Sequence, residues 1–426
     1  MLNVEVGEGS LDAYKAVLAD GLYDEVRSLA KDLKGARVAH VNATAHGGGV
    51  AEILRSIIPL YRDIGIDATW LVIEGNERFF SHTKQLHNAL QGAAHRFEIA
   101  DWDHYMKWNE GKAKADLWDY DVVFIHDPQP AGIRQFVAPT GAKWVWRCHI
   151  DTSEPNREAW GKIRDMVNGY DAAIFSTADF VGPGLTVPLI ELIAPAIDPL
   201  TPKNMPMPEN EARAVVASYG IDPDRPFISQ VSRFDPWKDP LGVVACFGML
   251  KEKHPTLQLA MLGNFADDDP EGHVMFRELE EAVSGVPDVN IITDLTDLVN
   301  PFQALSQVIL QKSTREGFGL TVTEALWKGT PVVAGNVGGI RLQIVDGAGG
   351  FLVSSVEECA AKVDYLLLNE DERIALGKAG RERVRAKFLL PRLLRDELAL
   401  MRTLLNSTGK GPAAGQDDSI GAEAVV

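Results

Sequence analysis

Two basic residues stand close together in the second half of the chain. Arg233 and Lys238 occur in the segment Ser-Arg-Phe-Asp-Pro-Trp-Lys, at the end of an apolar run at residues 227–232. A forked guanidinium beside a compact ammonium suits the oxygens of a diphosphate, which each can hold with charge-assisted hydrogen bonds. This pattern predicts an anion-binding loop at the end of a strand. A solvated loop with two ordinary surface charges is the alternative.

Two glutamates in the same half, Glu316 and Glu324, are eight residues apart. The first begins a Glu-Gly-Phe-Gly-Leu segment after an apolar run at residues 308–311. Gly317 and Gly319 permit a tight entry into a helix, and eight residues make about two helical turns, so both carboxylates can face one groove. A capping glutamate and a surface glutamate are the plainer interpretation. The first amides of this helix, able to hold an oxyanion or a sugar hydroxyl, would be those of Phe318, Gly319 and Leu320.

Three consecutive glycines lie in the first half. Gly47, Gly48 and Gly49 come between an apolar run at residues 36–44 and a helical pattern at residues 50–63. Glycines at such a turn let the backbone approach a ligand, and the helix N-terminus offers free N–H groups. The spacing is that of neither a dinucleotide-binding fingerprint nor a P-loop. Because a turn alone needs fewer glycines, we expect a ligand-facing loop, with a tight turn as the alternative.

Polar residues also end two predicted strands of the first half. His126 and Asp127 end one of them, and His149 and Asp151 end the next. A histidine at the carboxyl end of a strand can contact a ligand in a cleft, but a lone histidine is more often structural. The acidic run at residues 267–269 is interpreted as a solvated charge cluster before a helix rather than as a metal site.

Apolar runs alternate with helical patterns, which predicts an α/β fold with parallel sheets covered on both faces. The proline-rich residues 195–208 divide two such series. We therefore expect a pair of doubly wound, Rossmann-like domains facing a cleft, with ligands at the carboxyl ends of the strands. The expected strands are residues 36–44, 69–73, 121–126, 143–148 and 172–176 in the first half and 227–232, 257–262, 289–293, 308–311 and 331–334 in the second.

Domain boundaries follow from the same patterns. The first domain is expected over residues 1–200 and the second over residues 201–385. Residues 386–405 are expected to form a C-terminal helix that packs back across the cleft. The Gly- and Ala-rich residues 406–426 are expected to be a disordered tail.

Composition excludes several classes of protein. The chain has 426 residues, 46% of them hydrophobic and 24% charged, as in ordinary globular proteins with two domains. Its net charge of −18 disfavours nucleic acid and anionic membranes as partners. No apolar run is long enough for a membrane span, and the first residues lack a signal-peptide pattern. Three widely spaced cysteines fit neither a disulfide framework nor a zinc site, so we expect a cytoplasmic protein.

Taken together, these motifs resemble the retaining glycosyltransferase family 4, whose members have the two-domain GT-B fold. The resemblance rests on the Arg/Lys pair followed by the two glutamates, and it covers about residues 35–405. A narrower likeness, to the trehalose glycosyltransferring synthases, rests on the segments at residues 42–54, 72–75, 84–92, 146–151 and 311–319. Those enzymes join the glucose of an NDP-glucose to free glucose, giving α,α-trehalose and NDP.

The resemblance implies a role for each motif. Arg233 and Lys238 would bind the donor diphosphate and stabilise the leaving group, while Glu316 would contact the donor sugar. Glu324 would bind the ribose hydroxyls, and His149 would hydrogen-bond the donor sugar near the reaction centre. The backbone around Gly317, Phe318, Gly319 and Leu320 would hold the donor, and Gly47, Gly48, Gly49, Asp127 and Asp151 would form the acceptor and phosphate loops.

The same resemblance implies that no cofactor is tightly bound and that no side chains form a metal site. NDP-glucose, glucose and trehalose would be the small-molecule partners, with Mg²⁺ as a stimulating ion and a homodimer as the assembly. Trehalose phosphorylase and sucrose- or glycogen-type transferases are alternatives within the fold. An NDP-sugar epimerase and a nucleotide-sugar sensor are alternatives in other classes, and the intact Arg/Lys and Glu motifs disfavour both.

Overall fold

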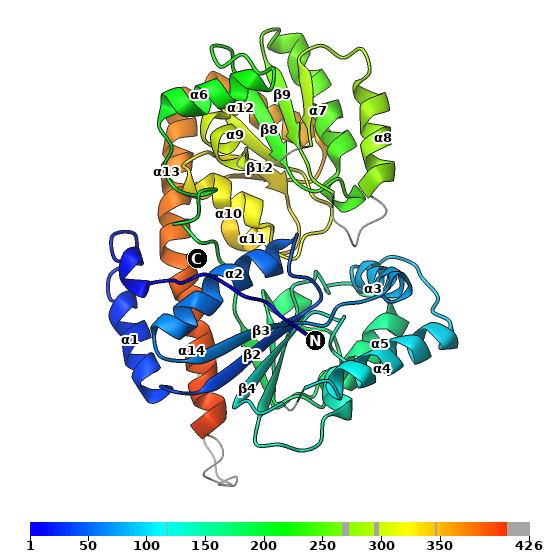
Figure 1. The fold of residues 1–426 in the computed structure, drawn as a ribbon. Coiled ribbons are helices and arrows are strands. Elements are labelled where there is room, and N and C mark those ends of the chain that lie inside the picture. Colours follow the sequence, from blue (N-terminus) through cyan, green and yellow to red (C-terminus); the bar gives the residue numbers. More distant parts are fainter. Residues whose placement is uncertain (117, 266–271, 294–297, 346, 407–426) are drawn as a thin grey trace, which may run out of the picture.

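The computed structural model describes residues 1–116, 118–265, 272–293, 298–345 and 347–406. These residues form two α/β domains stacked end to end (Figure 1). The expected tail at residues 406–426 and the acidic run at residues 267–269 lie outside this part of the chain, apart from Asn406. Among the described helices, none combines the length and apolarity that a membrane crossing needs.

The first domain is built on a seven-stranded sheet with the order β1-β3-β2-β4-β5-β6-β7, in which only β1 is antiparallel to its neighbour. Its strands are β1 (Leu2–Asn3), β2 (Arg37–Asn42), β3 (Asp67–Val72), β4 (Val122–His126), β5 (Lys143–Arg147), β6 (Ala172–Phe175) and β7 (Leu189–Leu192). Its helices are α1 (Leu22–Asp32), α2 (Gly49–Asp63), α3 (Glu77–Leu90), α4 (Ile99–Ala113) and α5 (Arg157–Val167).

The second domain has a six-stranded parallel sheet with the order β10-β9-β8-β11-β12-β13. Its strands are β8 (Phe227–Val231), β9 (Gln258–Leu262), β10 (Val289–Ile292), β11 (Val308–Gln311), β12 (Val332–Gly335) and β13 (Gly350–Val353). The helices of this half are α6 (Glu209–Ser218), α7 (Pro240–Lys253), α8 (Gly272–Val283), α9 (Val299–Leu305), α10 (Leu320–Trp327), α11 (Ile340–Gln343), α12 (Val356–Leu368) and α13 (Glu370–Lys387).

The central strands of both sheets are buried, and this explains why apolar runs in the sequence predict their positions. Every residue of β4, β8 and β9 is buried, because helices cover both faces of each sheet. The expected strands lie where β2 to β6 and β8 to β12 are found. Edge strand β7 escaped prediction because its residues alternate between half-buried and exposed positions. The aromatic stretch that begins near Trp102 forms α4, which buries Trp102 and Tyr105 in the core of the first domain.

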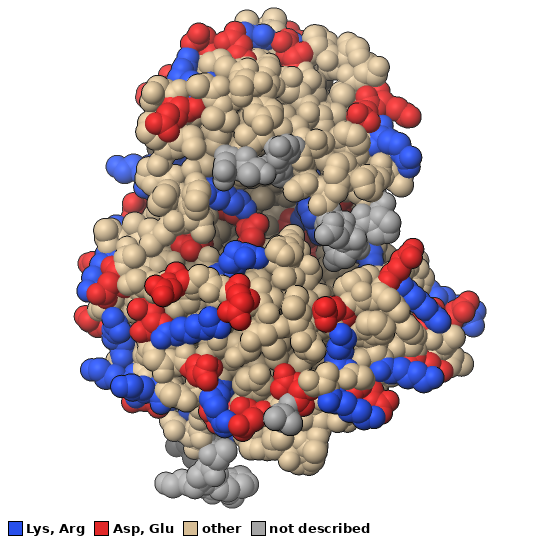
Figure 2. Space-filling view, viewed as in Figure 1, with Lys and Arg blue, Asp and Glu red and all other residues tan. Residues whose placement is uncertain are grey.

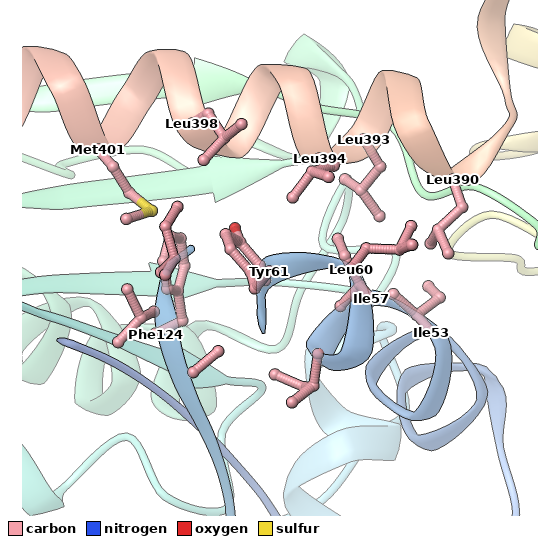
Figure 3. Close-up of a cluster of buried hydrophobic side chains, with 14 of the residues drawn as sticks. Ile53, Ile57, Leu60, Tyr61, Phe124, Leu390, Leu393, Leu394, Leu398 and Met401 are labelled. Carbon is pink, nitrogen blue, oxygen red and sulfur yellow. The ribbon is translucent and has the colours of Figure 1, made fainter. Parts of the chain in front are cut away.

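The last helix, α14 (Leu390–Asn406), belongs to the first domain although it follows the second in the chain. It packs on α1 and α2, and none of its residues lines the cleft between the domains. In Figure 3 its apolar side chains face those of α2 and β4. The labelled residues are Ile53, Ile57, Leu60, Tyr61 and Phe124 on one side and Leu390, Leu393, Leu394, Leu398 and Met401 on the other.

A polar network lies under this apolar contact. Glu397 of α14 accepts a hydrogen bond from the hydroxyl of Tyr61 at 2.7 Å, and it is ion-paired with Arg147 at the end of β5. The side chains of Arg147 and Glu397 are 2% and 1% exposed, so neither charge has water as an alternative partner. Removing one partner would leave the other charged and buried, which is strongly destabilising. The C-terminal helix is therefore held in place by charge as well as by apolar packing.

Candidate active site

A cleft of about 610 Å³ separates the two domains. Figure 2 shows the hollow between the two lobes, with basic and acidic side chains around it. Its walls come from the loops that follow β2, β4 and β5 in the first domain and β8 and β11 in the second. These are the carboxyl ends of parallel strands, where ligands bind in open α/β sheets.

The two cations found in the sequence both line this cleft. Lys238 ends a short 3₁₀ helix, Pro236–Lys238, which Asp235 caps by accepting a hydrogen bond from the amide of Trp237 at 2.9 Å. Arg233 lies 4.0 Å from the same aspartate. The capped turn therefore holds both basic side chains on one wall, as binding of a diphosphate would require.

Glu316 faces Lys238 across the second-domain wall. Its Oε2 lies 2.5 Å from Nζ of Lys238 and also accepts a hydrogen bond from the hydroxyl of Ser313 at 3.2 Å. The two opposite charges form an ion pair that holds both side chains in place. The carboxylate is thus placed beside a cation on the wall of the cleft.

The glycines after Glu316 bring the two domains into contact. A Cβ on Gly317 would lie 1.9 Å from the carbonyl oxygen of His149, in the opposite domain, so only glycine fits there. Gly319 has a φ of +83° and precedes the first residue of α10. Three residues at this helix entry, Phe318, Gly319 and Leu320, line the cleft.

The glycine loop of the first domain meets the same helix. Gly47 and Gly48 have φ values of +72° and +81°, and Gly49 begins α2. A Cβ on Gly49 would lie 2.8 Å from a methyl group of Leu320. All three glycines line the cleft, so the N-terminus of α2 faces the entry of α10 across it.

Glu324 does not line the cleft as the structure stands. Its side chain is 1% exposed, and Oε1 lies 2.8 Å from Nζ of Lys203. Lys203 also contacts Glu52 of α2 at 3.0 Å. Burial lowers the pKa of this lysine, but the two carboxylates outweigh that effect and the pKa is raised. A cation from the segment between the domains therefore covers the carboxylate that was expected to meet the ribose.

The two aspartates of the first domain have different surroundings. Asp127 lines the cleft, has a φ of +65°, and accepts a hydrogen bond from the amide of His149 at 2.8 Å. Burial raises its pKa to about 7. Asp151 is 1% exposed and binds the amide and hydroxyl of Ser153 at 3.1 Å and 2.6 Å. It is absent from the cleft lining, because its carboxylate shapes the loop from beneath.

Several cleft residues had no role assigned from the sequence. One face of α3 and its C-terminal end line the cleft with mainly polar residues, whose helical spacing was a usable signal. The segment at residues 84–92 was noted only as part of a family likeness. Lys203 and Glu52 gave no signal, since one lies in an irregular segment and the other looks like an ordinary surface helix position. Arg315 crosses the cleft to Ser153 and Glu154, at 3.1 Å and 2.6 Å. The residues of the α3 stripe are Phe80, Thr83, Lys84, His87 and Gln91.

Among the residues that the structure describes, no group of three or more His, Cys, Asp or Glu side chains is placed to hold a metal ion. The acidic run at residues 267–269, which the sequence predicts to be a solvated charge cluster, lies outside the described residues.

Comparison with known proteins places the chain among glycosyltransferases. Residues 40–182 match the family of trehalose synthase N-terminal domains, and residues 212–383 match the group 1 glycosyl transferases. The chain is 46% identical to a trehalose synthase of Rubrobacter xylanophilus over 411 residues, covering 94% of this chain and 99% of that protein. It is 44% identical to a trehalose synthase of Thermococcus litoralis over 404 residues, covering 93% and 98%.

The fold also matches solved structures. Sucrose-phosphate synthase from Thermosynechococcus elongatus superposes with a TM-score of 0.70 at 17% identity, covering 87% of this chain and 100% of that chain. An identity this low supports the shared GT-B architecture and nothing finer. The expected fold class is thereby confirmed.

Proposed function

Since this chain belongs to the trehalose synthase family within the group 1 glycosyltransferases and has the GT-B fold, we propose that it transfers glucose from an NDP-glucose to free glucose. The α configuration would be retained, and the products would be α,α-trehalose and NDP. The observation that carries this proposal is the convergence of two cations and a carboxylate from the second domain on a cleft whose opposite wall holds His149.

The chemistry follows from where charge develops. As the bond between the anomeric carbon and the phosphate oxygen breaks, its electron pair passes to the diphosphate. Arg233 and Lys238 stabilise that growing charge more than they stabilise the ground state, which lowers the barrier. The acceptor hydroxyl attacks from the side of the leaving group and gives its proton to the departing phosphate oxygen. This front-face course needs no carboxylate nucleophile on the opposite face, unlike a retaining hydrolase.

The remaining residues divide between donor and acceptor. Glu316 accepts hydrogen bonds from donor sugar hydroxyls when Lys238 turns toward the phosphate. The polar stripe of α3 and the Gly47–Gly49 loop form the wall for the acceptor, which is small enough to be enclosed. Hydrogen bonds to several hydroxyls give specificity, because a wrong acceptor would leave a buried polar group unpaired.

The test is a product analysis. The protein is incubated with ¹³C-glucose together with one donor, UDP-, ADP- or GDP-glucose, in three separate reactions, and the products are identified by NMR. Parallel reactions contain maltose alone, or α-glucose 1-phosphate and glucose. Formation of α,α-trehalose with release of NDP is expected. Trehalose from maltose alone would indicate an isomerase, and trehalose from α-glucose 1-phosphate and glucose would indicate a phosphorylase. Binding of NDP-glucose without turnover by any of these routes would indicate a sensor. Each reaction is repeated with EDTA and with Mg²⁺.

A further inference from the structure

Three histidines form a row that runs from the core of the first domain to the cleft. Nδ1 of His40 lies 3.0 Å from Nε2 of His126, and Nδ1 of His126 lies 3.0 Å from Nε2 of His149. Their strands explain the row: β2 pairs with β4 and β4 with β5, so their carboxyl ends are adjacent. The centroids of successive rings are 5.3 Å apart and the ring planes are inclined by 27° and 17°, so the rings lie edge to edge, as hydrogen bonds between ring nitrogens require.

The surroundings keep all three rings neutral. Burial lowers the pKa of His40 to about 3, and it lowers the pKa of His126 and His149 well below the usual value. The guanidinium of Arg147 acts in the same direction on each. A neutral imidazole carries one N–H, so one nitrogen donates and the other accepts.

Two successive bonds between neutral rings allow only two arrangements. In the first, His40 donates from Nδ1 to His126, and His126 donates from Nδ1 to His149, whose own proton is then on Nδ1. In the second, every donor is Nε2 and the direction is reversed, so His40 carries its proton on Nε2. Any other combination sets two lone pairs or two N–H groups against each other.

The buried end of the row distinguishes the arrangements. Nε2 of His40 is buried without a hydrogen-bond partner among the residues that the structure describes, and the stacked ring of Phe124 covers one face of this imidazole at a centroid distance of 4.6 Å. The second arrangement would leave an N–H there with nothing to accept it. An unpaired buried N–H is rarer in proteins than an unpaired acceptor. The first arrangement leaves a lone pair, which is the lesser cost.

We propose that His40 and His126 are positioning residues that hold His149 as the tautomer with its proton on Nδ1. Nε2 of His149 is occupied by His126, so Nδ1 is the ring nitrogen left to a ligand in the cleft that His149 lines. His149 therefore presents an N–H donor. That this donor meets a hydroxyl of the donor sugar rests on the proposed function.

The backbone of His149 is fixed as firmly as its ring. Its amide donates to Asp127 at 2.8 Å, and its carbonyl oxygen lies against Gly317 of the opposite domain. On this fixed main chain, the hydrogen bond with His126 orients the ring. A change at His126 should alter the tautomer and leave the position of the main chain unchanged.

The tautomer can be measured directly. The full-length protein, which has ten histidines, is labelled with ¹⁵N-histidine. The ring signals that disappear in the His149→Asn and His40→Asn variants identify those of His149 and His40. We expect a protonated, pyrrole-type Nδ1 and a bare, pyridine-type Nε2 at His149, without any ligand. A protonated Nε2 at His149 would overturn the proposal. This test of the tautomer does not depend on whether the protein forms trehalose.

A matched pair of variants tests the consequence for the reaction. In His126→Asn the side-chain amide can still donate to Nε2 of His149, whereas the similarly shaped His126→Leu cannot. Freed of its partner, the imidazole of His149 should revert to the Nε2–H tautomer that a free imidazole side chain prefers. We expect kcat within a few-fold of wild type for the Asn variant and about 10- to 100-fold lower for the Leu variant, with donor KM changed far less.

Equal losses of kcat in the two variants, or an unchanged His149 tautomer in His126→Leu, would show that His126 acts by packing alone. Thermal melting of both variants identifies a Leu variant that does not fold. In that case the ¹⁵N measurement of the His149 tautomer in the wild-type protein decides whether the proposal holds.

Discussion

The ammonium of Lys203 lies 2.8 Å from Glu324 and 3.0 Å from Glu52, so one side chain between the domains joins a carboxylate of each. The proposed function gives Glu324 the ribose hydroxyls of the donor. The ribose and Lys203 would then compete for the same carboxylate, so the donor binds only to molecules in which this ion pair is open. An equilibrium of this kind weakens the apparent affinity by the fraction of competent molecules.

Removing the bridge should therefore strengthen donor binding. For Lys203→Met we expect the Kd of NDP, measured by calorimetry, to fall about 2- to 10-fold, together with a larger radius of gyration of the ligand-free protein in small-angle scattering. Lys203→Arg, which keeps the charge, serves as the control. Weaker NDP binding to the Met variant would mean that Lys203 contacts the nucleotide itself.

The two cations should be needed for turnover and not for folding. Arg233→Ala and Lys238→Ala should each raise the barrier by about 2–4 kcal/mol, a loss of roughly 30- to 1,000-fold in kcat/KM. Arg225→Ala removes the same charge from a residue that pairs with Asp288 and does not line the cleft, so it should keep its activity. Near wild-type turnover in either cleft variant would refute the leaving-group role.

The two glutamates should differ kinetically. Glu316 lies beside Lys238 at the expected reaction centre, so Glu316→Gln should lower kcat. Glu324 lies deeper, under Lys203, so Glu324→Gln should chiefly raise the Kd of NDP. Steady-state kinetics and calorimetry on both proteins provide the comparison. A pair of variants that lose kcat alike, with NDP affinity unchanged, would contradict the division.

Contact between the domains should depend on one glycine. In Gly317→Ala the new Cβ would meet the carbonyl oxygen of His149 at 1.9 Å, and neither backbone can yield without separating the loops. We expect loss of nearly all activity and an expanded shape in small-angle scattering, with little change in Tm. Gly248→Ala, where a Cβ meets nothing within 4 Å in helix α7, is the control and should be neutral or slightly stabilising.

Asp127 should make the protein less stable as the pH rises. Burial raises its pKa to about 7 from an ordinary value of 3.8, so between about pH 4 and 7 the folded state holds a proton that the unfolded state has released. Stability then falls as the pH increases through this window. Asp127→Asn keeps an acceptor for the amide of His149 and removes the titration. In urea unfolding between pH 4 and 7, the free energy of unfolding of this variant should rise relative to that of the wild type as the pH increases. A difference between the two proteins that does not change with pH would argue against the raised pKa.

Local pattern predicts only part of such a site. The strand ends and the residues after them could be inferred, because a fully buried strand such as β8 leaves an uninterrupted apolar run. The spacing of Glu316 and Glu324 was equally visible. Whether Glu324 faces the cleft depends on Lys203, more than a hundred residues away, and on how closely Gly49 approaches Leu320. Contacts between domains leave no periodic trace in a sequence, so they could not be foreseen.

The row of histidines illustrates the same limit. His126 and His149 were noticed because they end strands, but each alone was more readily explained as structural. His40 lies inside an apolar strand and carried no signal of its own. Strand order brings the three together, and strand order is a property of the sheet rather than of any one segment.

The position of α14 has a consequence for how the protein is made. The ribosome releases residues in sequence, so the side chains of Leu394, Leu398 and Met401 that complete the first hydrophobic core emerge only after the entire second domain. During synthesis, the apolar surface of the first domain that α14 covers therefore stays exposed until α14 has emerged. Intermediates with such exposed surface are prone to aggregate. The second domain can close around its own sheet earlier. The first domain is therefore the first to be synthesised and the last to complete its folding.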